Sequence, residues 1–324
     1  MRPRPAHPEQ PREGLGLAAR VARSGWRRYP AELTESIRAE RARAGFAELR
    51  VPEQPLPDLG AAWLGHASVL VRLGGMWVLT DPVFSERIGV KLGPVTLGVA
   101  RRAPAIHPDS LPPIDLIVLS HAHFDHLDRP TLARLASERT TVVTARHTRG
   151  LVPRGYGRVI EMPWNHRISV GEVEISTLPA AHWGARTVWD RHRGYNAYVL
   201  EAPRARVLFA GDTALTDTFR RVGGADLTIF GIGAYDPWIT KHASPEQVWA
   251  MHNDAGGRYL LPMHHSTFEL SDEPAHEPMA RLLAAAGGAA ESVVGRTLGE
   301  FVGLGSPRTP PDPQAGAGVQ LPAP

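Results

Sequence analysis

The chain has 324 residues, of which 43% are hydrophobic and 21% are charged, so it can bury a sizeable core and has the composition of a globular protein. It contains no cysteine, which excludes disulfides, iron–sulfur clusters, thiolate zinc sites and cysteine nucleophiles. A bound metal would need nitrogen and oxygen ligands from the 15 histidines and 33 acidic residues. Residues 1–30 contain seven Arg and two Glu, a charge of +5, so the remainder carries −2 of the total of +3.

The two ends of the chain differ from its middle. Residues 1–58 are predicted to be a basic N-terminal extension, partly helical over residues 30–49, with three prolines in residues 51–60 that exclude a regular element there. The basic arm could contact anionic lipid or nucleic acid, or it could be a solvated extension, which is the simpler interpretation. Residues 305–324, rich in Pro, Gly and Ala, are predicted to be disordered.

No signal-peptide pattern and no run of 18 apolar residues is found in the sequence. We therefore expect a cytoplasmic protein, with or without peripheral contact to the inner face of the membrane.

Residues 59–304 alternate strand-like runs with helical segments. Residues 61–81 contain two apolar runs across Gly74–Gly75, and residues 167–178 repeat this hairpin pattern around Gly171. Further β-rich runs lie at residues 114–119, 196–202, 205–212, 226–236 and 258–265. Hairpins first and strand–helix units later predict mixed sheets covered by helices, an α/β layered domain.

Two helices carry recognisable start signals. Residues 128–138 begin with Asp128 as a candidate N-cap, followed by a proline in the first turn. Residues 244–257 begin with Ser244 as N-cap and a proline at the first helical position, and Gln247 completes a capping box.

The segment SHAHFDHLD, residues 120–128, directly follows the apolar run at residues 114–119. A loop after a buried strand can aim several side chains at one point of the sheet edge. His121 and His123 can approach one metal ion while Asp125 and His126 turn toward a second, and imidazole with carboxylate suits zinc. A solvated polar loop or a helix start rich in capping residues are the alternatives, and the order HxHxDH argues against both.

Later strand-like runs end in residues of the same kinds. His182, Asp212, His264 and His265 each follow an apolar run, as His121 does. Taken singly, a histidine at a strand end is more often a hydrogen-bonded surface residue, and Gly-Asp-Thr can merely cap a helix. Taken together with HxHxDH, they predict a complete ligand set for a dinuclear site.

The order of these residues resembles the metallo-β-lactamase fold superfamily, over about residues 61–303. Seven collinear motifs are similar to the branch of zinc hydrolases related to N-acyl-phosphatidylethanolamine-hydrolysing phospholipase D, with a lactonase group acting on ascorbate 6-phosphate more distant: WLGHASVLV, LTDPVFSERIG, SHAHFDHLD, AHWGAR, FAGDT, IGAYDPW and HHSTFELSDEP. The resemblance implies a four-layer αββα sandwich over residues 59–304, with the site along one sheet edge.

The resemblance also implies roles for individual residues and two bound Zn²⁺ ions, with Mn²⁺ or Fe²⁺ as alternatives. His121, His123 and His182 would bind one ion, Asp125, His126 and His264 the other, and Asp212 would bridge them. His264 is preferred to His265 because the family's histidine stands three residues before Thr-Phe, here Thr267-Phe268. Asp125 or Asp212 is expected to carry the proton during hydrolysis.

Further residues are expected around the metals or in the pocket. Asp81 would orient a ligand imidazole, unless it only opens the turn before Pro82. His66 would line the cleft or satisfy its hairpin, and Asp128 would cap a helix and buttress the site. Aromatic residues could form an acyl slot and Arg186 could pair with a phosphate, ordinary packing being the alternative. His265 stands where close relatives usually have Trp. The residues expected in the pocket are therefore Trp183, Arg186, Tyr235, Trp238 and His265.

The leading functional hypothesis is a phosphodiesterase of the phospholipase D type, acting on N-acyl-phosphatidylethanolamine-like lipids at a membrane. A soluble metal-dependent hydrolase of lactones or small phosphoesters is the alternative, and a metal-dependent nuclease using the basic arm is a third. No nucleic-acid partner is expected, because no recognised RNA-binding motif is present. The sequence makes no prediction of oligomeric state.

Overall fold

A computed structural model describes residues 45–305 apart from positions 54, 94 and 188, together with Pro30 and Thr34. Residues 1–29 of the expected basic arm, most of residues 31–44 of the expected N-terminal helix and the C-terminal tail after residue 305 lie outside the described residues. The end of the expected helix is wrong, because residues 46–47 form a short strand.

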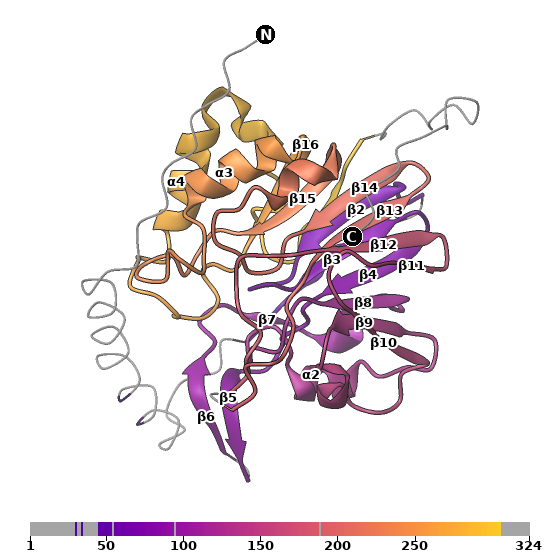
Figure 1. Ribbon diagram of the computed structural model, residues 1–324, viewed down its shortest axis with the longest axis vertical. Helices are drawn as coiled ribbons and strands as arrows, with labels where there is room; N and C mark the ends of the chain where they lie inside the picture. The colour runs from indigo at the N-terminus through magenta and orange to yellow at the C-terminus, as the bar shows by residue number, and fades with distance from the viewer. Residues whose placement is uncertain are drawn as a thin grey trace.

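Two larger β-sheets stack face to face in the described part of the chain, with helices on their outer faces (Figure 1). The first sheet has seven strands in the order β10-β9-β8-β4-β3-β2-β17, and the second has six in the order β11-β12-β13-β14-β15-β16. The first sheet consists of β2 (Leu59–Trp63), β3 (Val69–Leu73), β4 (Met76–Thr80), β8 (Leu116–Leu119), β9 (Thr141–Ala145), β10 (Arg158–Met162) and β17 (Phe301–Gly303). The second consists of β11 (Arg167–Val170), β12 (Val173–Leu178), β13 (Ala197–Ala202), β14 (Ala205–Phe209), β15 (Ala225–Gly231) and β16 (Gly257–Met263).

Alternation along the strands divides the core into layers. Val78 and Val118 of the first sheet face the second sheet and pack in one cluster with Val207 and Ile229. Their neighbours in sequence point outward, so that Leu79 and other apolar side chains form a separate cluster under the outer helix. This two-residue period is what a sheet buried on both faces requires.

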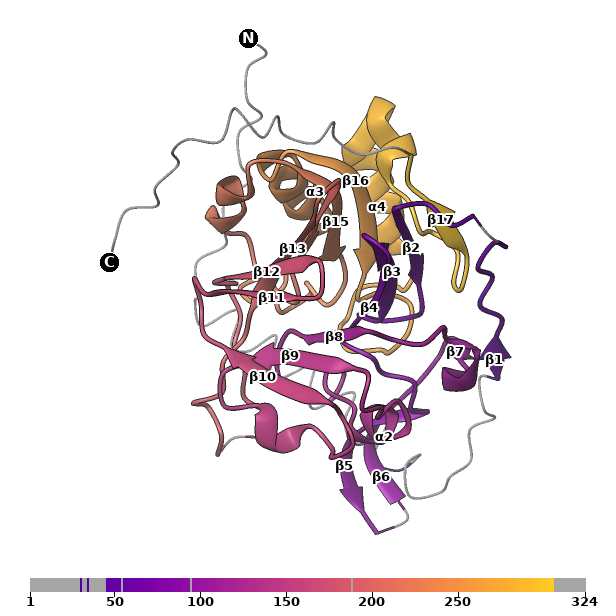
Figure 2. The same ribbon diagram turned by 90° about the vertical axis from the view of Figure 1, so that its right-hand side faces the viewer.

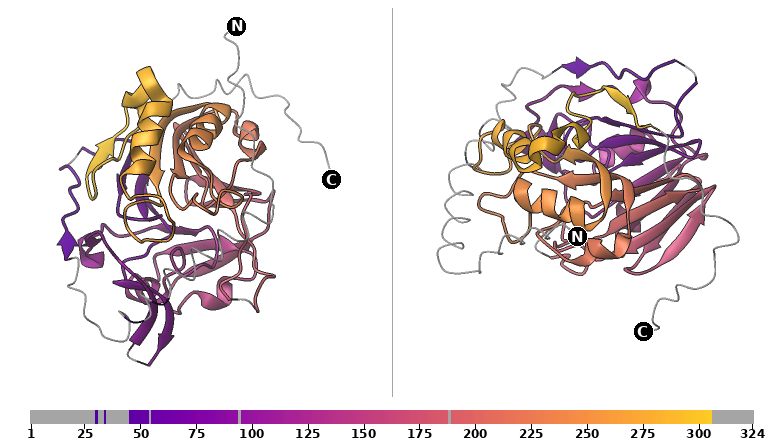
Figure 3. Two further views of the ribbon diagram at one scale, coloured as in Figure 1. Left: turned by 90° about the vertical axis from the view of Figure 1, so that its left-hand side faces the viewer. Right: turned by 90° about the horizontal axis from the view of Figure 1, so that it is seen from above.

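Helices pack on both outer faces. Figure 3, seen from above, shows the two stacked sheets with the orange helices beside the second. α2 (Arg129–Arg134) packs on the first sheet through Leu132, while α3 (Pro245–Asp254) and α4 (Glu277–Ala286) pack on the second through Val248 and Leu282. Short 3₁₀ turns complete the set: η1 (Pro108–Ser110), η2 (Arg149–Leu151), η3 (Thr218–Val222) and η4 (Gly287–Ser292). The expected α/β sandwich with αββα layers is therefore confirmed.

Local signals in the sequence account for several element boundaries. The β3–β4 hairpin turns through Gly74 at φ 55° and Gly75 at φ 84°, a pair of left-handed residues that a tight two-residue turn needs. The predicted capping box of α3 is present between Ser244 and Gln247. Asp128 does stand at the N-cap of α2, but its carboxylate accepts from the amide and hydroxyl of Ser85 and the hydroxyl of Thr131, and from no backbone amide of the helix itself.

Two small sheets complete the fold. β1 (Phe46–Ala47) pairs with β7 (Ala105–Ile106), so residues before position 59 pack on the domain. β5 (Arg87–Leu92) and β6 (Val95–Ala100) form a hairpin that projects from the lower end of the molecule in Figures 1 and 2. No pattern described in the sequence predicts this hairpin. No helix in the described part of the chain is both long and apolar enough to cross a membrane.

The candidate site is positioned by parallel strands that end at one edge. β14, β15 and β16 are parallel in the second sheet, and β4, β8 and β9 are parallel in the first. The carboxyl ends of parallel strands meet at the same edge of a sheet, where loops can converge.

Candidate metal centre

The loop that follows β8 supplies a compact set of imidazole and carboxylate groups. His121 and His126 are buried, and His123 and Asp125 are partly buried. The loop is closed by backbone hydrogen bonds from His126 and Leu127 to the carbonyl of His123. Four side chains capable of binding metal therefore lie within residues 121–126, and all four are buried or partly buried.

Residues from other strand ends join this loop in two groups of four. In each group the candidate ligand atoms lie within 4.8 Å of one another. One group is His121, His123, His182 and Asp212, and the other is His66, Asp125, His126 and His264. All seven residues that the sequence analysis singled out as ligands thus lie together, and His66 joins them.

The carboxylate of Asp212 lies where the two groups meet. Its Oδ2 atom is 3.0 Å from Nε2 of His126 and 3.2 Å from Nε2 of His264, both of the second group. The same atom is 3.7 Å from Nε2 of His182 and 3.9 Å from Nε2 of His121, both of the first. Only 4% of Asp212 is exposed, and neither carboxylate oxygen has a hydrogen-bond partner among the described residues. A buried carboxylate without hydrogen bonds is costly unless a cation occupies the space beside it.

Three of the imidazoles are held from behind. Nδ1 of His126 lies 2.6 Å from Oδ2 of Asp81, and Nδ1 of His182 donates to the carbonyl of Lys241 at 3.0 Å. Nδ1 of His121 contacts the hydroxyl of Ser120 at 2.8 Å. Each contact turns Nε2 toward the centre of the cluster, within 4 Å of Oδ2 of Asp212, which is the arrangement that metal-binding histidines generally have.

Charge attraction within the cluster outweighs burial for the central pair. Burial opposes ionisation of Asp212, yet His126, His264 and His242 hold the pKa of its carboxyl well below its ordinary value. Burial likewise opposes protonation of His126, but Asp212 and Asp125 raise its pKa well above the usual range. In His121, burial dominates and lowers the pKa well below the usual value. Asp212 is thus an anion whose two nearest imidazoles, His126 and His264, have raised pKa values, whereas burial lowers the pKa of His123 and His182 as it does that of His121. A divalent cation could replace the protons at this carboxylate.

Strained backbone marks the same place. His66, Asp81 and His264 have φ values of 50°, 32° and 60°, in the left-handed region that residues with a Cβ rarely adopt. Nε2 of His66 lies 3.0 Å from Oδ2 of Asp125, and burial lowers the pKa of His66 to about 3. Such strain persists only where surrounding contacts determine the conformation, and it is commonest at functional sites.

His242 is a member of the cluster that sequence reasoning missed. Its Nδ1 lies 3.9 Å from Oδ2 of Asp212, and its ring centroid lies 5.1 Å from those of both His182 and His264. Asp212, His242 and His264 form a third group whose ligand atoms lie within 4.8 Å of one another. His242 lies in the loop before α3 and belongs to none of the motifs quoted from the sequence, so no local signal marks it as part of the site.

The expected pocket residues fall into different places. Arg186 donates from Nη1 to the carbonyls of Ala122 and Leu127 at 2.8 Å, so it braces the loop after β8, and its guanidinium stacks over Phe124 at 3.9 Å. Trp183 packs against His123, with ring centroids 4.8 Å apart.

Two other expected pocket residues are held by neighbours. The hydroxyl of Tyr235 donates to Glu277 of α4 at 2.7 Å and so turns toward that helix. His265 stacks on Trp63, with centroids 4.5 Å apart, and its Nδ1 lies 3.0 Å from the hydroxyl of Ser266. Trp238 is half-buried and belongs to the loop that precedes His242.

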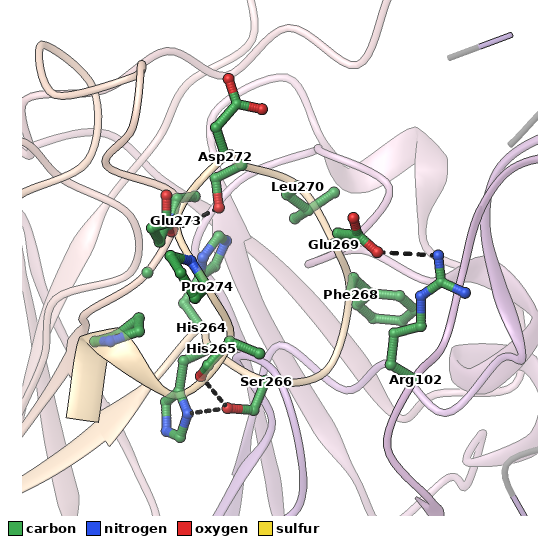
Figure 4. Close-up of a pocket in the computed structure, with 15 residues that line it drawn as sticks. Arg102, His264, His265, Ser266, Phe268, Glu269, Leu270, Asp272, Glu273 and Pro274 are labelled. Carbon is green, nitrogen blue, oxygen red and sulfur yellow. Dashed lines mark hydrogen bonds and ion pairs between the residues drawn. The ribbon is translucent and has the colours of Figure 1, made fainter. Parts of the chain in front are cut away.

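A cavity of about 420 Å³ opens beside His264 (Figure 4). Its walls combine apolar side chains with a charged rim, on which Arg102 and Glu269 form an ion pair of 3.1 Å. The lining residues are Arg102, Gly233, Ala234, His264, His265, Ser266, Phe268, Glu269, Leu270, Ser271, Asp272, Glu273, Pro274, Ala275 and Pro278. This volume lies within the range of pockets that bind small molecules.

Two curated relatives match the chain over most of the described residues. An uncharacterized protein of Mycobacterium tuberculosis is 34% identical over 249 residues, which cover 70% of this chain and 64% of that protein, less than two thirds of its length. The N-acyl-phosphatidylethanolamine-hydrolyzing phospholipase D 1 of Caenorhabditis elegans is 31% identical over 235 residues, 65% of each chain.

Among solved structures, the isothiocyanate hydrolase from Delia radicum gut bacteria superposes with a TM-score of 0.59. The alignment covers 75% of this chain and 98% of that one at 13% identity, which supports the fold alone. Residues 76–265, which include every histidine and aspartate of the two four-residue groups except His66, match the family described as the beta-lactamase superfamily domain. The layered fold, the cluster at its sheet edge and this match together show that the chain belongs to the beta-lactamase superfamily.

Proposed function

We propose that this protein is a metal-dependent hydrolase with a dinuclear centre. The observation that carries the proposal is the buried carboxylate of Asp212, which accepts no hydrogen bond of regular geometry and lies within 4 Å of imidazoles from both groups of four ligand-capable side chains. Two cations would neutralise this carboxylate and satisfy the imidazole nitrogens that lack partners, among them Nε2 of His126 and Nε2 of His264.

The donor set fits zinc, with Mn²⁺ or Fe²⁺ as alternatives, because it consists of imidazole nitrogens and carboxylate oxygens only. His121, His123 and His182 would hold one ion, Asp125, His126 and His264 the other, and Asp212 would contact both. Two zinc ions would supply a water molecule with a pKa near 7 and would polarise the electrophile. His66 contacts Asp125 and would orient this carboxylate.

The exposure of the two carboxylates separates their roles. The side chain of Asp125 is 14% exposed and that of Asp212 is 1% exposed. Asp125 therefore faces the opening of the cluster, where it can accept a proton from an incoming water and pass it to the leaving group. Asp212 is enclosed and would serve as the fixed anionic centre.

For the substrate we propose an N-acyl-phosphatidylethanolamine-like lipid. Hydrolysis would add water across the phosphodiester: an oxygen–phosphorus bond forms, the bond from phosphorus to the ethanolamide oxygen breaks, and that oxygen leaves protonated. The products would be phosphatidic acid and an N-acylethanolamine. The 31% identity to the phospholipase of Caenorhabditis elegans supports this substrate class.

A soluble lactone or small phosphoester is the second candidate. It is favoured by the limited size of the cavity, about 420 Å³, and by the Arg102–Glu269 ion pair on its rim, which could bind a small polar substrate.

The test is release of phosphatidic acid from vesicles that contain N-acyl-phosphatidylethanolamine, using protein reconstituted with zinc and measured for metal content. Asp212→Asn should abolish release, because the amide cannot provide the shared negative charge. Asp217→Asn is the matched control, since Asp217 has a 74% exposed side chain, and it should retain activity.

The outcomes separate the candidates. Release that disappears only in Asp212→Asn supports both site and substrate. Two bound metals without release from vesicles, combined with hydrolysis of a lactone or a small phosphodiester, would replace the lipid by a soluble substrate. Protein that binds no divalent metal would overturn the proposal.

A further inference from the structure

The β5–β6 hairpin carries an apolar stripe that runs from the core into solvent. Side chains two residues apart lie on one face of a strand, so Ile88, Val90 and Leu92 share a face. Ile88 and its partner Val99 are buried, whereas Val90 is 49% exposed and Leu92 is 57% exposed. In Figures 1 and 2 this end of the hairpin extends beyond the two sheets. Water contact with such a stripe is unfavourable unless another surface covers it.

The base of the stripe belongs to the mouth of the site. Ile88 and Val99 pack in one cluster with Phe268 and Leu270, both of which line the cavity, and with Phe124 of the loop after β8. The hairpin is therefore continuous with the wall of the cavity beside His264 and with the loop that carries His123 and Asp125.

A second exposed apolar group follows a segment that contacts the same cluster through Phe124. The segment after His182 contacts Phe124 through the guanidinium of Arg186, 3.9 Å from the ring centroid. Three residues further along, Trp189 is 90% exposed, the largest exposed fraction among the large apolar side chains of the described residues. Tryptophan is enriched where protein meets the head-group region of a bilayer.

The charged side chains of the hairpin are positive, and Asp190, next to Trp189, is paired with Arg193. Residues 87–100 contain Arg87 and Lys91 and no acidic residue. Lys91 lies between Val90 and Leu92, is exposed, and makes no ion pair with another described residue. Beyond Trp189, Arg191 is exposed as well. Apolar side chains interleaved with cations complement an anionic lipid surface, because the aliphatic stems can enter the bilayer while the charges stay at the phosphates.

We propose that the tip of the β5–β6 hairpin and the Trp189 segment form a membrane-docking edge that inserts into an anionic bilayer and presents the metal centre to it. The inference rests on the proposed function for its purpose, since a cavity of about 420 Å³ leaves most of a phospholipid's chains outside and a docked edge would leave them in the bilayer. The contact itself requires no hydrolysis.

The experiment is co-sedimentation of the full-length protein with vesicles of phosphatidylcholine and phosphatidylglycerol, compared with vesicles of phosphatidylcholine alone. Wild-type protein should bind the anionic vesicles. The double variant Val90→Ser/Leu92→Ser and the single variant Trp189→Ser should each weaken binding on the order of tenfold. Lys91→Glu should weaken binding to anionic vesicles only. Phe46→Ser is the matched control, because Phe46 is 65% exposed and lies on β1, outside both segments.

Melting temperature and metal content identify a variant that fails to fold. If an apolar variant does not fold, the inference is tested by Lys91→Glu and by quenching of Trp189 fluorescence with brominated lipid. Loss of binding in the three edge variants and not in Phe46→Ser supports the inference. Wild-type protein that ignores anionic vesicles would overturn it, as would binding that depends only on residues 1–29. Self-association that the same variants abolish would also overturn it, since the edge would then bind a second copy. Binding to vesicles without hydrolysis of the lipid would contradict the proposed substrate but would still support the docking edge.

Discussion

Nδ1 of His126 lies 2.6 Å from Oδ2 of Asp81, and both side chains are fully buried. Asp81 also accepts hydrogen bonds from the amide and hydroxyl of Ser120, so its carboxylate is saturated with donors. Burial raises the pKa of Asp81, and these partners oppose that rise. The contact fixes the ring of His126 so that Nε2 faces Asp212.

Asp81→Asn is expected to weaken metal binding by about 10- to 100-fold, because an amide NH₂ would face donors and would no longer hold the imidazole. Competition with a chromophoric chelator measures the change. Asp115→Asn is the control, since Asp115 also accepts a backbone hydrogen bond, from Trp77, but lies outside the cluster. Equal metal affinity in the two variants would contradict an orienting role for Asp81.

Gly211 places Asp212 at the meeting point of the two ligand groups. It has φ +59°, and a Cβ there would lie 2.7 Å from Cβ of Ser120 and 3.1 Å from the carbonyl oxygen of Asn196. Gly211→Ala should therefore lower the free energy of unfolding by about 3 kcal/mol, from backbone strain and displacement of the loop after β8. Urea denaturation tests this. Gly150→Ala, where a Cβ meets no atom within 4 Å, should change stability little.

His242 faces Asp212 across 3.9 Å, beyond hydrogen-bond reach, and belongs to neither group of four. We expect His242→Gln to retain two metal ions per chain and to reduce kcat on the order of a hundredfold, as loss of a proton-transferring or substrate-orienting group does. Metal analysis and kinetics on one preparation decide this. Loss of one metal ion would instead place His242 among the ligands. The exposed His276→Gln is the control.

Local patterns made much of the fold and the centre predictable. HxHxDH lies within one loop, so its spacing alone indicates convergence. The later ligands follow apolar runs, and parallel strands bring their ends to one edge. The glycine pair predicts the β3–β4 hairpin because a tight two-residue turn requires residues with left-handed backbone conformation, which glycine adopts easily.

Features set by distant contacts could not be predicted in the same way. His242 reaches Asp212 because the amide of Ala243 donates to the carbonyl of Thr213 and the carbonyl of Lys241 accepts from His182. The role of Arg186 as a brace depends on carbonyls some 60 residues away in sequence. The β5–β6 hairpin has an apolar stripe that is only half covered, so its burial pattern does not mark it as part of the core.

The stability of the domain should depend on pH through His252. This residue of α3 is 2% exposed, its Nδ1 lies 2.8 Å from the hydroxyl of Thr228, and burial lowers its pKa to about 4. Above the ordinary histidine pKa of about 6.5, both folded and unfolded states are neutral and the full stability is present. As the pH falls from about 6.5 to about 4, His252 binds a proton in the unfolded state but not in the folded state. The free energy of unfolding therefore declines by about 3 kcal/mol.

His252→Gln removes this titration while an amide can still bond to Thr228. Its free energy of unfolding, measured in urea across the same pH range, should therefore fall less on acidification than that of the wild type, by about 3 kcal/mol. Both proteins share every titrating group of the metal centre, so the difference between them isolates His252. The exposed His276→Gln should follow the wild type. Parallel curves for wild type and His252→Gln would show that the buried imidazole does not couple protonation to unfolding.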